Sequence, residues 1–218
     1  MGGGVSPAAA RVQIWLIATL KGGTRKTTTA MLLAFALAAR GHNVLVIDAD
    51  YGSQGVTDWG TRVYASGGEL PFDVAQWTPS MGLLVPFIQK QARETGAAIV
   101  IVDVGGEAPE VLGQAVKIAR LVISPVGPEQ AELGRLPATA AIVAASRVPH
   151  SVVLTRVPLP GKGAARDARQ VIEADGYQVL ATEVEHNRDR YANIWGTVPA
   201  DLGAYEDMAD ELLKGGAA

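Results

Sequence analysis

The residues best suited to chemistry lie between an apolar run at 14–18 and a helix-like pattern at 29–40. They read Lys21-Gly22-Gly23-Thr24-Arg25-Lys26-Thr27-Thr28. A glycine turn between a strand and a helix offers backbone N–H groups to an anion, a lysine adds a point charge, and a threonine hydroxyl can bind Mg²⁺. The order predicts a phosphate site. It does not fit the standard phosphate loop G-x-x-x-x-G-K-[ST], whose glycines would fall at Leu20 and Arg25.

Acidic residues follow two further apolar runs that read as buried strands. Asp48 and Asp50 end the run at 44–47, and Asp103 ends the run at 97–102. Carboxylates in such places hold Mg²⁺ through water or orient an attacking water. Ligands of open α/β sheets bind at the carboxyl edge of the strands, so we expect these acids beside the glycine loop. The alternative for each is an ordinary acidic turn after a strand.

The elements that must position these residues alternate along the chain. We expect strands at 12–18, 44–47, 72–75, 97–102, 121–124, 151–155 and 179–184. We expect helices around Trp59 and at 26–40, 80–94, 109–119, 129–146, 161–174, 187–196 and 205–214. Gly41 should end the first of these, and Pro137 should interrupt the helix at 129–146. Apolar strands alternating with helices predict an α/β fold, a mostly parallel, twisted sheet with helices on both faces.

The composition narrows the possible functions. The 218 residues, 48% of them hydrophobic, predict one domain at 12–218 after a flexible tail at 1–11. The chain has no cysteine, which excludes disulfides, thiolate metal sites and a cysteine nucleophile, and fits a reducing cytoplasm. The apolar runs are too short to span a bilayer. A net charge of −3 argues against a globally basic DNA-reading module but leaves a local basic patch open.

The loop resembles the deviant Walker A motif of the ParA/MinD family of ATPases. That motif reads K-G-G-x-x-K-[ST], and residues 21–27 match it at every fixed position, with Arg25 where members often carry glycine. The resemblance covers about residues 11–214. It implies a P-loop NTPase-like fold, ATP and Mg²⁺ as cofactors, and hydrolysis of ATP to ADP and phosphate. It also implies a homodimer that forms with ATP, in which Lys21 reaches the partner's phosphates as an arginine finger does.

The resemblance assigns roles to matching residues. It implies nucleotide contacts by Lys21, Gly22, Gly23, Thr24, Arg25, Lys26, Thr27, Thr28, Thr155 and Arg156. It implies catalysis by Lys21, Lys26 and Asp50, and a Mg²⁺ site at Thr27, Asp48 and Asp103. Residues 183–191 stand where a loop closes over the base, and residues 104–106 where a switch region senses the γ-phosphate. The turn at 51–55 departs from the family's Pro-Gln-Gly.

Within the family, the chain resembles small plasmid-partition ParA proteins. We expect no helix-turn-helix domain before the first strand, and no membrane partner, because the end at 205–214 is acidic. The resemblance implies non-specific DNA binding by the ATP dimer, a ParB-like DNA-bound adaptor that stimulates hydrolysis, and a cytoplasmic, nucleoid-associated protein. The candidate DNA contacts are Lys162, Arg166, Arg169, Arg188 and Arg190. Charges that alternate in sign, as at 166–169, are equally typical of a solvated helix face.

Several functions stay open. The leading hypothesis is an ATP-dependent dimerising switch for plasmid or chromosome partition. The same scaffold can position a protein cluster, which gene neighbourhood would separate. Arg25 and the altered turn at 51–55 favour a nucleotide-binding module with little or no turnover. A small-molecule kinase of the ordinary phosphate-loop class would need a substrate pocket and lid arginines that the sequence does not identify.

Overall fold

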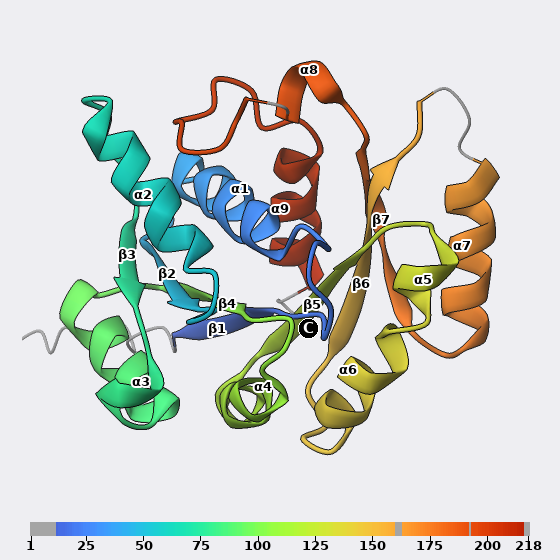
Figure 1. The fold of residues 1–218 in the computed structure, drawn as a ribbon, viewed down its shortest axis with the longest axis horizontal. Helices are drawn as coiled ribbons and strands as arrows, with labels where there is room; N and C mark the ends of the chain where they lie inside the picture. Colours follow the sequence, from blue (N-terminus) through green and yellow to red (C-terminus); the bar gives the residue numbers. More distant parts are fainter. Residues whose placement is uncertain (1–11, 160–162, 192, 216–218) are drawn as a thin grey trace, which may run out of the picture.

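The computed structural model describes residues 12–159, 163–191 and 193–215. Its strands form one seven-stranded sheet in the order β3-β2-β4-β1-β5-β6-β7 (Figure 1). They are β1 (Gln13–Ile17), β2 (Val44–Ala49), β3 (Asp73–Gln76), β4 (Ile99–Val104), β5 (Leu121–Val126), β6 (His150–Val157) and β7 (Gln178–Glu185). Every pairing within the described sheet is parallel. The predicted parallel α/β sheet is therefore confirmed.

Helices cover both faces of this sheet (Figure 1). They are α1 (Lys26–Ala39), α2 (Gly55–Ala65), α3 (Leu84–Thr95), α4 (Pro109–Ala115), α5 (Gln130–Leu133), α6 (Leu136–Ala144), α7 (Gly163–Ala174), α8 (Arg188–Tyr191) and α9 (Ala204–Gly215). One core joins the sheet to α1, α2 and α9. On the other face, two cores join it to α3, α4, α6 and α7. No helix among the described residues is long and apolar enough to cross a membrane.

The sequence produces this sandwich because its central strands are apolar on both sides. In β1, Trp15 and Ile17 pack toward α1, while Ile14 and Leu16 pack toward the opposite layer. Each such fully buried side chain contributes about 1.5–3 kcal/mol. Helix α1 is buried almost all round, because it packs on the sheet and α2 and α9, which also contact the sheet, pack beside it. It therefore has no polar face and cannot move without opening the core.

The structure differs from the expected elements mainly at their ends. β5 continues through Pro125 to Val126, beyond the expected end of this strand at residue 124. The strand tolerates Pro125 because pairing with β1 ends at Ile123, so the missing N–H removes no bond on that side. Pro137 interrupts the helix at 129–146 as predicted, leaving α5 and α6. Gly41 ends α1 with φ 80, the left-handed conformation that glycine adopts readily.

The carboxyl ends of the strands meet at one edge, where the loop at 20–25 leaves β1 for α1. β1 lies between β4 and β5, so connections depart from this point toward both sides of the sheet. Such a switch point is where open α/β sheets bind ligands. Hydroxyls tie the loop to its β5 side, where Thr19 Oγ1 donates to the Pro125 carbonyl at 3.1 Å and the Leu20 N–H donates to Thr139 Oγ1 at 3.0 Å.

Candidate active site

The glycine loop presents unpaired backbone donors. The N–H groups of Gly22, Gly23 and Thr24 donate to no described residue. Gly23 and Arg25 have φ values of 77 and 68, so the loop bends through left-handed conformations before α1 begins. Together with the first turn of α1, these donors face a cavity of about 750 Å³. An anionic group is the ligand such a loop binds.

Lys26 is the cation inside this cavity. Its side chain is buried, and Nζ donates to the Lys21 carbonyl at 2.9 Å. Burial lowers the pKa of Lys26, while the charges of Asp103 and Asp50 oppose that shift. A desolvated ammonium that bonds only to a carbonyl is poised to bind a phosphate oxygen.

Carboxylates line the β2–β4 side of the loop, and we call Thr27, Asp48 and Asp103 the acidic flank. Asp48 and Asp103 lie opposite one another in the register of β2 and β4. Thr27 Oγ1 donates to Asp103 Oδ2 at 2.6 Å. The N–H and hydroxyl of Thr57 both donate to Asp48 Oδ2 at 2.8 Å. The Oδ1 atoms of both aspartates are buried without a partner among the described residues.

Burial dominates the electrostatics of the acidic flank. It raises the pKa of Asp103 to about 7, partly offset by the Thr27 hydrogen bond, and it also raises the pKa of Asp48. Orphaned buried oxygens call for a cation or ordered water. No group of three or more His, Cys, Asp or Glu side chains within the described ranges could hold a metal alone. A cation here would also need Thr27, water and ligand oxygens, which are the ligands that Mg²⁺ takes.

Asp50 lies just beyond β2 and lines the cavity. Its Oδ1 accepts a hydrogen bond from the Ser53 N–H at 3.3 Å. The glycines after β4 pack against it and against the loop. A Cβ at Gly105 would lie 2.9 Å from Asp50 Oδ1, and one at Gly106 would lie 2.5 Å from the Lys21 carbonyl oxygen. Only glycine lets the β4 turn approach the phosphate loop this closely.

A second cavity of about 440 Å³ adjoins the first and shares Arg25 and Thr28 with it. The structure brings Thr155 and Arg156 into its wall together with residues 184–187, and their contact with a base stays a prediction. Thr155 Oγ1 and Arg156 Nε are buried here without a partner among the described residues. A flat ring with polar edges fits such a lining.

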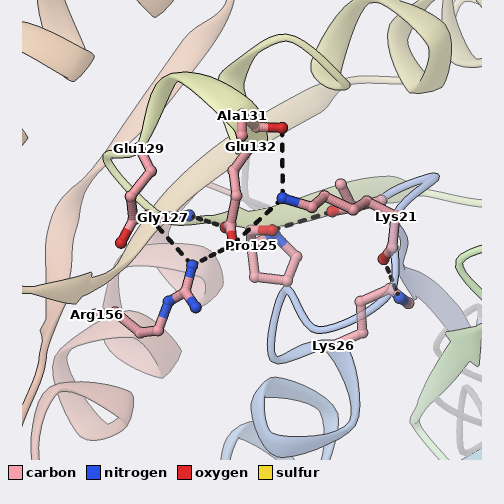
Figure 2. A network of polar contacts seen from close by, with 9 residues as sticks. Lys21, Lys26, Pro125, Gly127, Glu129, Ala131, Glu132 and Arg156 are labelled. Carbon is pink, nitrogen blue, oxygen red and sulfur yellow. Dashed lines mark hydrogen bonds and ion pairs between the residues drawn. The ribbon is translucent and has the colours of Figure 1, made fainter.

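Lys21 does not point into the cavity of its own loop (Figure 2). Its Nζ donates to the Ala131 carbonyl at 3.3 Å and lies 3.7 Å from Glu132 Oε1, on the β5 side. The structure thus brings Lys26, Asp50 and the acidic flank together around one cavity, and Lys21 lies apart from them.

The candidate DNA contacts are only partly available. Arg169 pairs with Glu173 and Glu183, and Arg190 pairs with Glu185 and Asp201. Arg166 is exposed on α7. Lys162 and the side chain of Arg188 lie outside the described part of the chain. The basic patch stays a prediction.

Sequence reasoning missed three residues near the site. Thr57 holds Asp48, Glu132 meets Lys21, and Trp195 lines the phosphate cavity with its indole N–H donating to Asp58 at 2.7 Å. None of the three belongs to a recognisable local motif. Glu132 and Trp195 are also distant in sequence from the residues that they approach. Only the tertiary structure reveals them.

Comparisons with known proteins agree with this geometry. Residues 15–199 match the family model of the CobQ/CobB/MinD/ParA nucleotide binding domain, and the chain belongs to this family. The sequence-based resemblance is therefore confirmed.

Two relatives and one solved structure are informative. The chain is 33% identical over 175 residues to "Maintenance of carboxysome distribution protein A" from Gloeobacter kilaueensis, covering 79% of this chain and 76% of the relative. It is 30% identical over 148 residues to "Protein ParA" from Rhizobium radiobacter, covering 65% and 64%. A putative plasmid partition protein from Borrelia burgdorferi B31 bound to AMPPNP shares the fold, with TM-score 0.72, 17% identity and coverage of 94% and 100%.

Proposed function

We propose that this chain is an ATPase switch that dimerises with ATP and uses hydrolysis to release its cargo or track. One observation carries the proposal. The loop holds two lysines, and Lys26 lines the phosphate cavity while Lys21 is directed away from it, toward α5. Because Lys21 belongs to the phosphate motif but does not line the cavity of its own chain, it is suited to bind a phosphate held by a second copy of the chain.

Each residue has a distinct part in the proposed reaction. Lys26 and the N–H groups of residues 22–28 bind the β- and γ-phosphates. Asp50 orients the attacking water, because its carboxylate lies just beyond β2 and lines the cavity. Lys21 of the partner copy neutralises the charge that develops during transfer. Thr155 and Arg156 contact adenine in the second cavity, with Arg25 between base and phosphates.

The acidic flank fits Mg²⁺. Thr27 would bind it directly, and the unpartnered oxygens of Asp48 and Asp103 would hold its waters. Mg²⁺ would supply charge neutralisation on the phosphate oxygens. The AMPPNP bound to the Borrelia protein supports an adenine nucleotide as the ligand of this fold.

The cargo is the finer part of the proposal. We infer plasmid or chromosome partition in the cytoplasm, with non-specific nucleoid DNA as the track and a ParB-like adaptor that stimulates hydrolysis. The relative named ParA supports this reading. A protein-cluster cargo is the second candidate, favoured by the 33% identity to the carboxysome distribution protein. Pull-down partners from the native host would separate the two, because a centromere-binding adaptor argues for DNA and a cluster component argues against it.

Size-exclusion chromatography with light scattering tests the dimer. The Asp50→Ala variant should be a monomer with Mg²⁺–ADP and a dimer with Mg²⁺–ATP. A monomer with both nucleotides contradicts the proposal. Phosphate release by the wild-type chain, with and without DNA, tests turnover. Absence of phosphate release, or release that persists in Lys26→Ala, would contradict an ATPase that uses this loop.

A further inference from the structure

A buried carboxylate on the β5 side of the loop holds two cations at once (Figure 2). Glu132 is 5% exposed. Its Oε1 accepts a hydrogen bond from Arg156 Nη2 and lies 3.7 Å from Lys21 Nζ. Its Oε2 accepts the Gly127 N–H at 2.5 Å. We call Lys21, Gly127, Glu129, Glu132 and Arg156 the glutamate cluster.

The backbone of the cluster is shaped around these contacts. A Cβ at Gly127 would lie 2.6 Å from Arg156 Nη2 and 3.0 Å from Glu132 Oε2, so only glycine leaves room for the carboxylate. Arg156 itself has φ 56, an unusual conformation for a residue with a side chain. Close packing and a rare backbone conformation together show that the position of Glu132 is closely defined.

The two cations are bound unequally. The side chains of Lys21 and Arg156 are similarly exposed, at 29% and 27%, but Lys21 Nζ stays 3.7 Å from the carboxylate, whereas Arg156 donates a direct hydrogen bond to it. If Lys21 leaves, Glu132 keeps Arg156 and the Gly127 N–H. The departure therefore leaves no unpaired buried charge, which is the costly event in breaking buried ion pairs.

We propose that Glu132 is a positioning residue for Lys21. It holds the lysine amine on the β5 side of a single chain and yields it to the phosphates of a second copy, which carry more charge. Arg156 sets the strength of this hold, because it supplies competing positive charge to the same carboxylate. The inference rests on the proposed function for the destination of Lys21, but the hold itself exists in the single chain and can be measured there.

Amine reactivity tests the hold directly. The nucleotide-free chain is treated with an acetylating ester, and acetylation of Lys21 is followed by mass spectrometry, with exposed Lys117 as internal reference. Glu132→Gln should speed acetylation of Lys21 about threefold, as loss of a partly exposed ion pair implies. Arg156→Met should slow it, since Lys21 then becomes the sole cation of Glu132.

Glu129→Gln is the matched control. Glu129 pairs with Arg156 and is 57% exposed, but it has no contact with Lys21. Its variant should match the wild-type rate. Equal Lys21 rates in Glu132→Gln and Glu129→Gln, with both folded by circular dichroism, would overturn the inference. If Glu132→Gln does not fold, Arg156→Met still decides, because an unchanged or faster rate there contradicts a shared carboxylate.

Dimer formation gives the second readout. In the Asp50→Ala background, Glu132→Gln should lower the ATP concentration for half-maximal dimer about threefold, because Lys21 is already released. Glu132→Asp, which keeps the charge, should return this value toward that of the parent. A higher ATP requirement in Glu132→Gln overturns the inference. A wild-type chain that never dimerises refutes the proposed function alone, since the acetylation result stands independently.

Discussion

Two carboxylate regions flank the phosphate loop, and they differ in whether the buried carboxylate oxygens have hydrogen-bond partners. On the acidic flank, Asp48 and Asp103 each keep one buried oxygen without a partner among the described residues. In the glutamate cluster, Glu132 is equally buried, yet both of its oxygens accept hydrogen bonds and two cations surround it. The carboxylates of the acidic flank are therefore incomplete without a ligand, whereas the Glu132 carboxylate has partners for both oxygens in the single chain.

The difference shows how the two regions would respond to nucleotide. The acidic flank gains stability when a cation arrives, because until then one buried oxygen of each aspartate has no partner among the described residues. The glutamate cluster can only exchange one partner for another. The first region therefore suits binding, and the second suits a switch whose resting state is already satisfied.

The largest expected effect concerns turnover. Asp50→Ala should reduce phosphate release by about 10²–10⁴-fold, the usual contribution of a group that positions or activates a nucleophile. Nucleotide binding, measured by calorimetry, should change little. Asp73→Ala, an exposed carboxylate at the start of β3, is the control and should retain activity. Retained turnover in Asp50→Ala would remove this residue from the mechanism.

In the nucleotide-free chain, removing a charge from the glutamate cluster and removing one from the acidic flank should change the free energy of unfolding in opposite directions. Glu132→Gln should lower the free energy of unfolding by roughly 2–3 kcal/mol, because it weakens satisfied buried contacts. Asp103→Asn should raise it by about 1 kcal/mol, because it removes a carboxylate whose burial is only partly offset by the Thr27 hydrogen bond. Urea denaturation without Mg²⁺ measures both. Changes of the same sign would show that the contrast between the regions is wrong.

A comparable effect is the pH dependence of stability that comes from His150, whose ring contacts Ser124 in β5. Ser124 Oγ in β5 donates to the Ala18 carbonyl at 2.6 Å, so His150 Nε2, at 2.8 Å from the same hydroxyl, donates to it. Burial lowers the pKa of His150 to about 4. The unfolded chain then binds more protons between about pH 4 and 6.5 than the folded chain, and stability falls as pH decreases through this range.

This loss should reach about 2–3 kcal/mol at the acid end of the range. His150→Gln keeps a donor for Ser124 without titrating. The difference between wild type and His150→Gln in urea denaturation should therefore shrink as pH falls from 7 to 4.5. A difference that is constant with pH contradicts the assigned environment of His150.

The smallest effect on stability is expected at Arg25, which the two cavities share. Its φ of 68 is strained for arginine, so Arg25→Gly should stabilise the nucleotide-free chain by less than about 1 kcal/mol. Its side chain lines both cavities, so the same variant should weaken ADP binding by roughly tenfold. Thermal unfolding and calorimetry give the two values. Unchanged ADP affinity would assign Arg25 no role in nucleotide binding.

Most of the fold could be predicted from sequence, because apolar strands and flanking glycines are local signals. Residues 14–17 and 99–102 have no other stable place than a buried parallel sheet. The acidic flank was also predictable, since strand ends share an edge. The glutamate cluster was not. Glu132 follows no motif, and it meets Lys21 only because Pro137 confines α5 to one turn beside the loop.

The central claim, that Lys21 acts on the partner's nucleotide, has a direct test by mixing. Lys21→Ala and Asp50→Ala should each be inactive alone. In the mixed dimer, the Lys21→Ala copy keeps its own Asp50 and receives Lys21 from its partner, so one complete site forms. Mixing should therefore restore ATP hydrolysis. Mixed samples no more active than the separate variants, although dimers form, would contradict action in trans.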